Sequence, residues 1–164
     1  MTDLPAAEPY SMEALSKRRL KLWIRLLRTT RVAESQLREF LRVEHQSTLP
    51  RFDVMAALHR ARGEMTMSEL SRMLLVSNGN TTAVVDRLES DGLVARMSPA
   101  NDRRVVHVSL TASGRRRFEQ LAADHEARVD ALFGDMSAAD LDALEVLMHR
   151  MTPRTSTRSE TSSA

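Results

Sequence analysis

The chain has 164 residues, enough for one domain or for two small modules, and its 42% hydrophobic but only 4% aromatic content predicts a helical core of Leu, Val, Met and Ala. The absence of cysteine excludes disulfides, thiolate metal sites and cysteine nucleophiles, and no apolar run reaches the ~20 residues of a membrane span. The net charge is only +2, but the basic residues are 22 arginines and two lysines, a bias toward the side chain best suited to phosphate and guanine.

The two ends of the chain differ from the rest. Residues 1–11 are acidic and contain proline, and residues 153–164 are rich in Ser and Thr, so both are predicted to be disordered. The start of the chain is unlike a secretory signal peptide, and we therefore expect a cytoplasmic protein.

Two helices open the ordered part. The first runs from Met12 to about Val43 and carries apolar residues on two stripes, one of which contains Trp23. A helix that is apolar on more than one side is usually buried between two bodies. The second helix opens at Pro50, and Gly63 is predicted to end it.

A pair of short helices follows. Thr66 is predicted to cap the first of them, and the second runs from Ser77 to about Glu89. Gly92 then closes this helix, because a glycine readily adopts the positive φ that such an ending requires.

Residues 93–97 and 105–110 read as two strands joined by the polar loop 98–104. Thr111 is predicted to cap a long helix, and a break at 134–137 separates this helix from a last one. Two short helices followed by a hairpin are typical of a winged helix-turn-helix, so the predicted fold is mainly α with a small β-hairpin wing.

The start of the fourth helix is a run of small polar residues. In a helix-turn-helix these residues meet base edges in the major groove, where Asn pairs with adenine and Ser or Thr with several bases. Arg87, farther along, is expected to reach the DNA backbone. The alternative is a plain N-cap that satisfies the helix end. The candidate residues are Ser77, Asn78, Gly79, Asn80, Thr81 and Thr82.

The tip of the hairpin, Asn101-Asp102-Arg103-Arg104, is the second candidate DNA contact. A hairpin can place a guanidinium in a narrow minor groove, and Asp102 can hold Arg104 in position through a bidentate pair. The alternative is a solvated turn with a surface ion pair of little energetic value.

The stretch from Leu49 to Gly114 resembles the MarR family of winged-helix regulators, in the helix start at 77–82, VVDRLESDGLV (84–94), NDRR (101–104) and LTASGR (110–115). The resemblance implies an intertwined homodimer on a palindromic operator in double-stranded DNA, with Arg104 in the minor groove and an effector pocket between the lobes. It divides the chain into an arm (1–11), a dimerisation helix (12–48), the DNA-binding domain (49–110), further dimerisation helices (111–152) and a tail (153–164).

The first helix is strongly basic, with nine cations against Glu34 and Glu39 between residues 17 and 42. One explanation is salt bridging to acidic helices of a partner chain. The other is an anionic effector, and LKLWIRLLRTT (20–30) with LPRFDVMAALHRARG (49–63) resembles a branch of the family that responds to hydroxycinnamates or their coenzyme A thioesters. The expected effector-binding residues are Lys17, Arg18, Arg19, Trp23, Leu27, Phe52 and Met55. Trp23 is alternatively part of the dimer interface.

Other classes of function have less support. The five histidines form no close ligand pair, so no metal site or other cofactor is expected. No nucleophile, acid or base constellation indicates an enzyme. The sequence therefore predicts a ligand-responsive repressor of aromatic-acid catabolism genes. An architectural DNA-binding protein without effector and a dimeric interaction protein that has lost DNA binding remain as alternatives.

Overall fold

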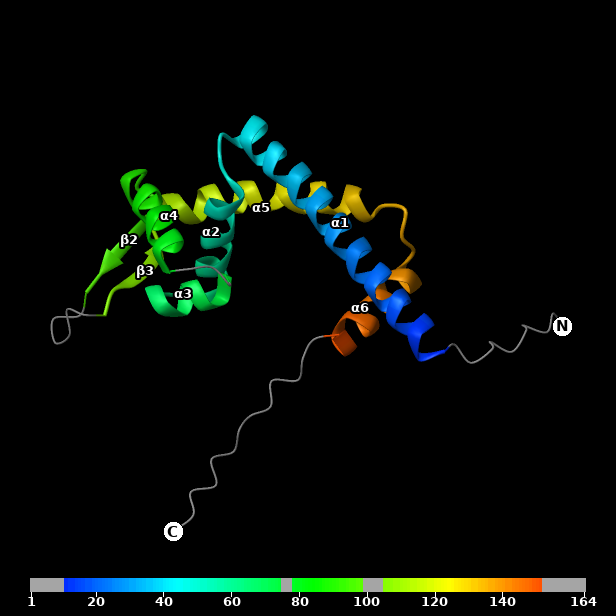
Figure 1. Cartoon of the computed structure of the whole chain (residues 1–164). Helices are drawn as coiled ribbons and strands as arrows, with labels where there is room; N and C mark the ends of the chain where they lie inside the picture. Colours follow the sequence, from blue (N-terminus) through cyan, green and yellow to red (C-terminus); the bar gives the residue numbers. More distant parts are fainter. Residues whose placement is uncertain (1–10, 75–77, 99–104, 152–164) are drawn as a thin grey trace, which may run out of the picture. The chain divides into compact units, whose positions relative to one another are not determined.

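The computed structural model describes residues 11–74, 78–98 and 105–151 (Figure 1). The elements are α1 (Met12–His45), α2 (Leu49–Ala61), β1 (Met65–Thr66), α3 (Met67–Leu74), α4 (Asn78–Ser90), β2 (Val94–Met97), β3 (His107–Leu110), α5 (Ala112–Phe133) and α6 (Ala138–Met151). They form two compact units that divide inside α5, after residue 128. The predicted fold class, mainly helical with a small antiparallel sheet, is confirmed.

Local hydrogen bonds set most helix ends. The hydroxyl of Ser11 accepts the backbone N–H of Ala14 (3.2 Å) where α1 begins. Thr48 occupies the N-cap of α2, and Pro50 lies in its first turn. The predicted end of α2 is wrong by one residue, because Arg62, with φ 54°, and not Gly63 adopts the left-handed conformation there.

The short α3 begins with a reciprocal cap. The carboxylate of Glu69 accepts the backbone N–H of Thr66 (2.8 Å), and the hydroxyl of Thr66 accepts the backbone N–H of Glu69 (3.2 Å). The bond from the Thr66 backbone N–H, together with one that the Thr66 hydroxyl donates to the same carboxylate oxygen (2.8 Å), lowers the pKa of Glu69. The expectation that Thr66 caps this helix is confirmed.

The three strands form one antiparallel sheet in the order β1-β3-β2. Val94 pairs with Leu110 and Met97 with His107, so β2 and β3 are the predicted hairpin. The two-residue β1 pairs with the other edge of β3, Met65 opposite Val108. The sequence did not indicate β1, because a strand of two residues has no periodicity of its own and exists only through its partner.

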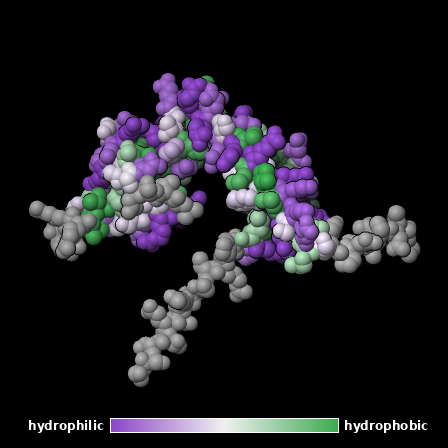
Figure 2. Space-filling view, viewed as in Figure 1, coloured by the Kyte–Doolittle hydropathy of each residue, from purple (hydrophilic) through white to green (hydrophobic). Residues whose placement is uncertain are grey.

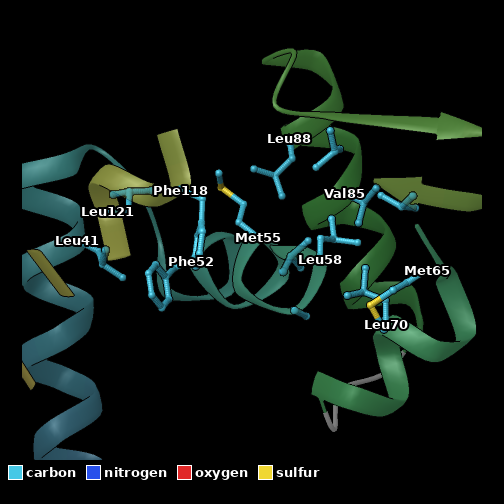
Figure 3. Packing of buried hydrophobic residues seen from close by; sticks show 14 residues of the cluster. Leu41, Phe52, Met55, Leu58, Met65, Leu70, Val85, Leu88, Phe118 and Leu121 are labelled. Carbon is cyan, nitrogen blue, oxygen red and sulfur yellow. The ribbon is translucent and has the colours of Figure 1, made fainter. Parts of the chain in front are cut away.

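One apolar core holds the first unit together (Figure 3). Phe52, Met55 and Leu58 of α2 lie at its centre, between the side chains of α4 and those of α5. Leu41, near the end of α1, is the residue of that helix that is fully buried, and it faces Phe52. The buried set is Leu41, Phe52, Val54, Met55, Ala57, Leu58, Met65, Leu70, Val85, Leu88, Val94, Val108, Phe118 and Leu121.

Much of the remaining apolar surface is uncovered in one chain, and hydrophobic side chains reach the surface among hydrophilic ones in Figure 2. Along α1 these residues include Leu20, Trp23 and Ile24. The second unit contains α6, which begins at a Ser137–Asp140 cap and has no buried residue.

Among the described residues, none of the helices has the length and apolar character needed to cross a lipid bilayer.

Candidate nucleic-acid interface

The fourth helix has one buried face and one exposed polar face. Thr81, Val85 and Leu88 recur at spacings of four and three, and all three are buried. This phase turns Asn80, Thr82 and Arg87 to solvent. Because the core fixes the rotation of α4 about its axis, the exposed face is held in a defined orientation rather than being free to turn.

Most of the described candidates for DNA contact lie on this exposed face. Besides the three polar side chains, Gly79 is exposed, and a Cβ added there would meet nothing within 4 Å. A ligand can therefore approach the backbone of the first turn closely. Thr81 is a correction: with 1% exposure it belongs to the core and not to the interface.

The remaining candidates cannot be placed. Ser77, Asp102, Arg103 and Arg104 lie outside the described residues. Asn78 is the first residue of α4, but its side chain is likewise outside the description. The predicted DNA contacts of these residues thus stay predictions.

Two arginine–carboxylate links, which sequence reasoning missed, hold the end of α4. Nη1 of Arg96, in β2, lies 2.6 Å from the carboxylate of Asp86 and 2.8 Å from that of Glu89. Nη2 of Arg51, in α2, lies 2.5 Å from the carboxylate of Asp91. The acids at 86, 89 and 91 are visible in the sequence, but their partners become apparent only once the chain has turned back at Gly92.

The same turn supports the start of α5. The hydroxyl of Thr111 donates to the carbonyl of Gly92 (2.7 Å) and accepts the backbone N–H of Gly114 (2.9 Å), which confirms Thr111 as the cap of α5. Gly114 packs directly on the backbone of Leu93. The end of α4, the wing strands and the first turn of α5 therefore meet at residues 91–93.

The predicted effector residues are divided between two places in the first unit. Lys17, Arg18 and Arg19 are exposed on α1, and the two arginines line a shallow trough of about 420 Å³. Its lining residues are Leu15, Arg18, Arg19, Lys21, Leu22 and Arg25. Lys17 pairs with Glu13 at 2.6 Å.

Trp23 is 55% exposed and Leu27 is half-buried, whereas Phe52 and Met55 are core residues. Trp23 lies about five helical turns before Leu41, the residue at which α1 meets Phe52. A single chain therefore does not bring the expected aromatic and basic residues into one pocket.

Phe52 is already covered by aromatic neighbours from α5. Its ring stacks on that of His125, with centroids 4.2 Å apart, and lies 5.6 Å from that of Phe118. Burial lowers the pKa of His125. Among the described residues, no three His, Asp or Glu side chains are arranged to hold a metal ion.

Known proteins share this fold and parts of this sequence. Residues 47–106 match the family model described as "MarR family". The uncharacterized HTH-type transcriptional regulator YkoM of Bacillus subtilis is 30% identical over 107 residues, which span 65% of this chain and 69% of YkoM. The chain belongs to the MarR family. The family match runs from the entry into α2 to the residue before β3, and so contains the complete helix-turn-helix.

Solved structures share this fold. A mutant MarR from E. coli, in complex with operator DNA, is 28% identical and superimposes with a TM-score of 0.73 over 83% of this chain and 96% of that one. BpsR of Bordetella bronchiseptica, whose DNA binding is regulated by 6-hydroxynicotinic acid, shares the fold at 24% identity (TM-score 0.71, 80% of this chain and 98% of BpsR). This MarR-family chain is accordingly a DNA-binding transcriptional regulator with the winged helix-turn-helix that its sequence predicted, and dimers are typical of the family.

Proposed function

We propose that the protein is a ligand-responsive repressor that binds a palindromic operator as a homodimer. The observation that carries this proposal is the exposed polar face of α4, with Asn80, Thr82 and Arg87 turned outward by a core that fixes the helix from behind. An exposed amide near a helix N-terminus suits bidentate pairing with adenine in the major groove. Arg87, on the last turn, suits a phosphate contact.

The dimer places two copies of α4 one helical turn of DNA apart, roughly 34 Å, so that each reads one half-site. In this proposal the loop that contains Asp102, Arg103 and Arg104 approaches the flanking minor groove, and Arg104 enters it. Narrow A·T tracts attract a guanidinium there by their negative potential. Ser77 and Asn78 contribute at the start of the recognition helix.

Asn80→Ala tests base reading by α4. We expect a loss of about 1–3 kcal/mol in binding free energy for the operator, confined to one base position, because one bidentate contact disappears. Fluorescence anisotropy on DNA from upstream of the protein's own gene, at a stated salt concentration, measures the affinity. Gln120→Ala, which removes an exposed amide from α5, is the matched control. An equal loss on every sequence would make Asn80 a phosphate contact.

For the effector we propose a small anionic aromatic acid or its coenzyme A thioester. The support is the row of cations in the trough on α1, where Arg18 and Arg19 stand beside the apolar Leu15 and Leu22. Guanidinium groups bind phosphates well, and neighbouring leucine side chains suit an acyl chain. Since one chain separates Trp23 from Phe52, completion of the pocket requires the second subunit or a change in conformation. Such a ligand releases DNA only if it binds the free state more tightly.

Titration of the protein–operator complex with 4-hydroxycinnamoyl-CoA, free coenzyme A and 4-hydroxycinnamate tests this proposal. We expect the thioester to weaken DNA binding by about tenfold, a coupling of about 1.4 kcal/mol. Arg19→Met should reduce the coupling, and Arg31→Met, which removes an exposed arginine of α1 outside the trough, should not. If none of the three compounds changes the affinity, the protein is better described as an effector-independent architectural protein.

A further inference from the structure

Arg96 occupies a position between the recognition helix and the wing. Its backbone lies in the middle of the β2–β3 ladder, opposite Val108. Its side chain crosses from the sheet to α4, where one nitrogen, Nη1, contacts the carboxylates of both Asp86 and Glu89, at 2.6 and 2.8 Å. These acids are three residues apart, so they lie one above the other on one side of the helix.

The contact between Arg96 and the two acids joins β2 to α4. Helix α4 and strand β2 are covalently joined only by residues 91–93, where Gly92 has a φ of 70° and its backbone is therefore permissive. The corner itself is held by the bond from Thr111 to Gly92, and Val94 of β2 packs in the same core as Val85 and Leu88 of α4. Arg96 adds a polar attachment farther along the strand, beyond that corner, which further restricts rotation of β2 against α4.

In sequence, the strand that Arg96 holds is followed by residues 99–104, which contain the predicted wing tip and lie outside the described residues. Arg96 is followed by Met97, the last residue of β2. A strand advances ~3.3 Å per residue, so a small rotation about Arg96 displaces Met97 and Ser98, at the described end of this segment, more than Arg96 itself. The angle between α4 and β2 therefore determines whether helix and wing fit the same stretch of DNA.

Electrostatic attraction alone does not explain why Arg96, Asp86 and Glu89 are brought together. The side chains of Asp86 and Glu89 are 56% and 40% exposed, and ion pairs at such exposure contribute little to stability. Both acids also lie on the helix that approaches a polyanion, where uncompensated negative charge opposes binding. Their presence is better accounted for by the geometry that they impose on Arg96.

We propose that Arg96 is a positioning residue for DNA recognition. Through its ion pairs with Asp86 and Glu89, it holds the recognition helix α4 and the wing strands in a fixed relative orientation. The proposal rests on the proposed function in one respect, namely that α4 and the hairpin bind the same operator. Arg96 acts through the two acids and does not itself contact DNA.

The decisive experiment removes the ion pairs from each side in the full-length protein. Arg96→Met and the pair Asp86→Asn/Glu89→Gln are measured by fluorescence anisotropy on the operator. Both variants should bind roughly tenfold more weakly, because each frees the wing from the helix. All three changes combined should bind no more weakly than the worse of the two, since they break the same link. Arg60→Met and Glu119→Gln/Glu126→Gln, which remove equal charges at exposed positions, should leave the affinity unchanged.

The acidic pair separates geometry from electrostatics. Removing two negative charges from the recognition helix should strengthen DNA binding if charge alone matters, and that result would overturn the proposal. The salt dependence gives a second criterion, since loss of a direct phosphate contact lowers the slope of log K against log salt by about 1. An unchanged slope for Arg96→Met is expected, and a lower one would make Arg96 a phosphate ligand instead.

Two further measurements exclude a mere loss of fold. Arg96→Lys keeps one cation in reach of the acids and should recover much of the affinity that Arg96→Met loses. Circular dichroism at the assay temperature should show every variant folded, and a loss of binding that tracks unfolding would refute the positioning role. If the wild-type protein binds no DNA at all, the proposed function fails; if the wild type binds and Arg96→Met binds equally well, only the role of Arg96 fails.

Discussion

At the scale of single residues, Gly114 is the glycine that is most constrained by its neighbours. A Cβ built on it would lie 1.8 Å from the carbonyl oxygen of Leu93 and 2.8 Å from the carbonyl carbon. Both are backbone atoms at the corner between α4 and β2, so neither can move aside as a flexible side chain would. The absence of a side chain is what lets α5 dock against this corner.

Gly114→Ala should therefore lower the free energy of unfolding by about 3 kcal/mol or more, as overpacking against backbone does in a well-packed core. Urea denaturation followed by circular dichroism measures the change. Gly79→Ala is the matched control: with nothing within 4 Å of its Cβ, the alanine should be neutral or stabilise α4 by up to about 0.5 kcal/mol. Equal stability of Gly114→Ala and wild type would show that α5 can shift away from Leu93 at little cost.

His125 gives a prediction about pH. Burial lowers its pKa below the usual value of 6.5, and its ring stacks on Phe52. As pH falls below about 6.5, the unfolded chain binds a proton at this site before the folded chain does, so the folded protein loses stability until the lower, folded-state pKa is passed. Above that window, the imidazole is neutral in both states and contributes no pH dependence.

His125→Phe keeps an aromatic ring on Phe52 but removes the titrating group. We expect the free energy of unfolding of the variant to fall less than that of the wild type when the pH is lowered from 7.5 to 5.5. Urea denaturation at both pH values measures the difference. If the two proteins show the same pH dependence, other groups account for it and His125 does not.

At the scale of elements, the sequence predicts best what local interactions determine. Thr66 and Thr111 cap their helices through bonds to residues three positions away, and Gly92 adopts the expected positive φ. Strand β1 was missed because its two residues depend on β3, more than forty positions later. The end of α2 was misplaced at Gly63 because Arg62 adopts a conformation for which side-chain identity is only a weak guide.

The residues of the candidate site likewise divide into those that local sequence predicts and those that depend on contacts between distant segments. The polar start of α4 is evident in the sequence, but only the helical phase set by Val85 and Leu88 shows that Thr81 points into the core while Asn80 does not. Arg96 carried no signal, because its acidic partners precede it across a reversal of the chain. The separation of Trp23 from Phe52 depends on where along its 34 residues α1 meets α2.

At the scale of the whole molecule, the apolar surface of α1 is the strongest indication of a second chain. Leu20 and Ile24 are 59% and 55% exposed, and their spacing of four residues puts them on the same side of the helix. Trp23 lies between them in sequence and is exposed to a similar degree. Contiguous apolar surface of this kind marks an interaction site, and a symmetric dimer covers it on both chains at once.

Leu20→Arg/Ile24→Arg should accordingly produce a monomer, because two buried cations without partners cost more than the lost apolar contacts alone. Sedimentation velocity measures the state of association, and emission from Trp23, the one tryptophan of the chain, should shift to the red as the ring becomes hydrated. The control Ala61→Arg/Ser68→Arg adds the same charge at exposed positions of α2 and α3 and should remain dimeric.

The monomer should retain a folded helix-turn-helix, since Leu41 is the fully buried residue by which α1 enters that core. It should nevertheless lose most of its affinity for a palindromic operator, because one half-site is then bound without the other. A dimer that survives both arginines would place the subunit interface elsewhere and leave the exposed face of α1 free for a ligand.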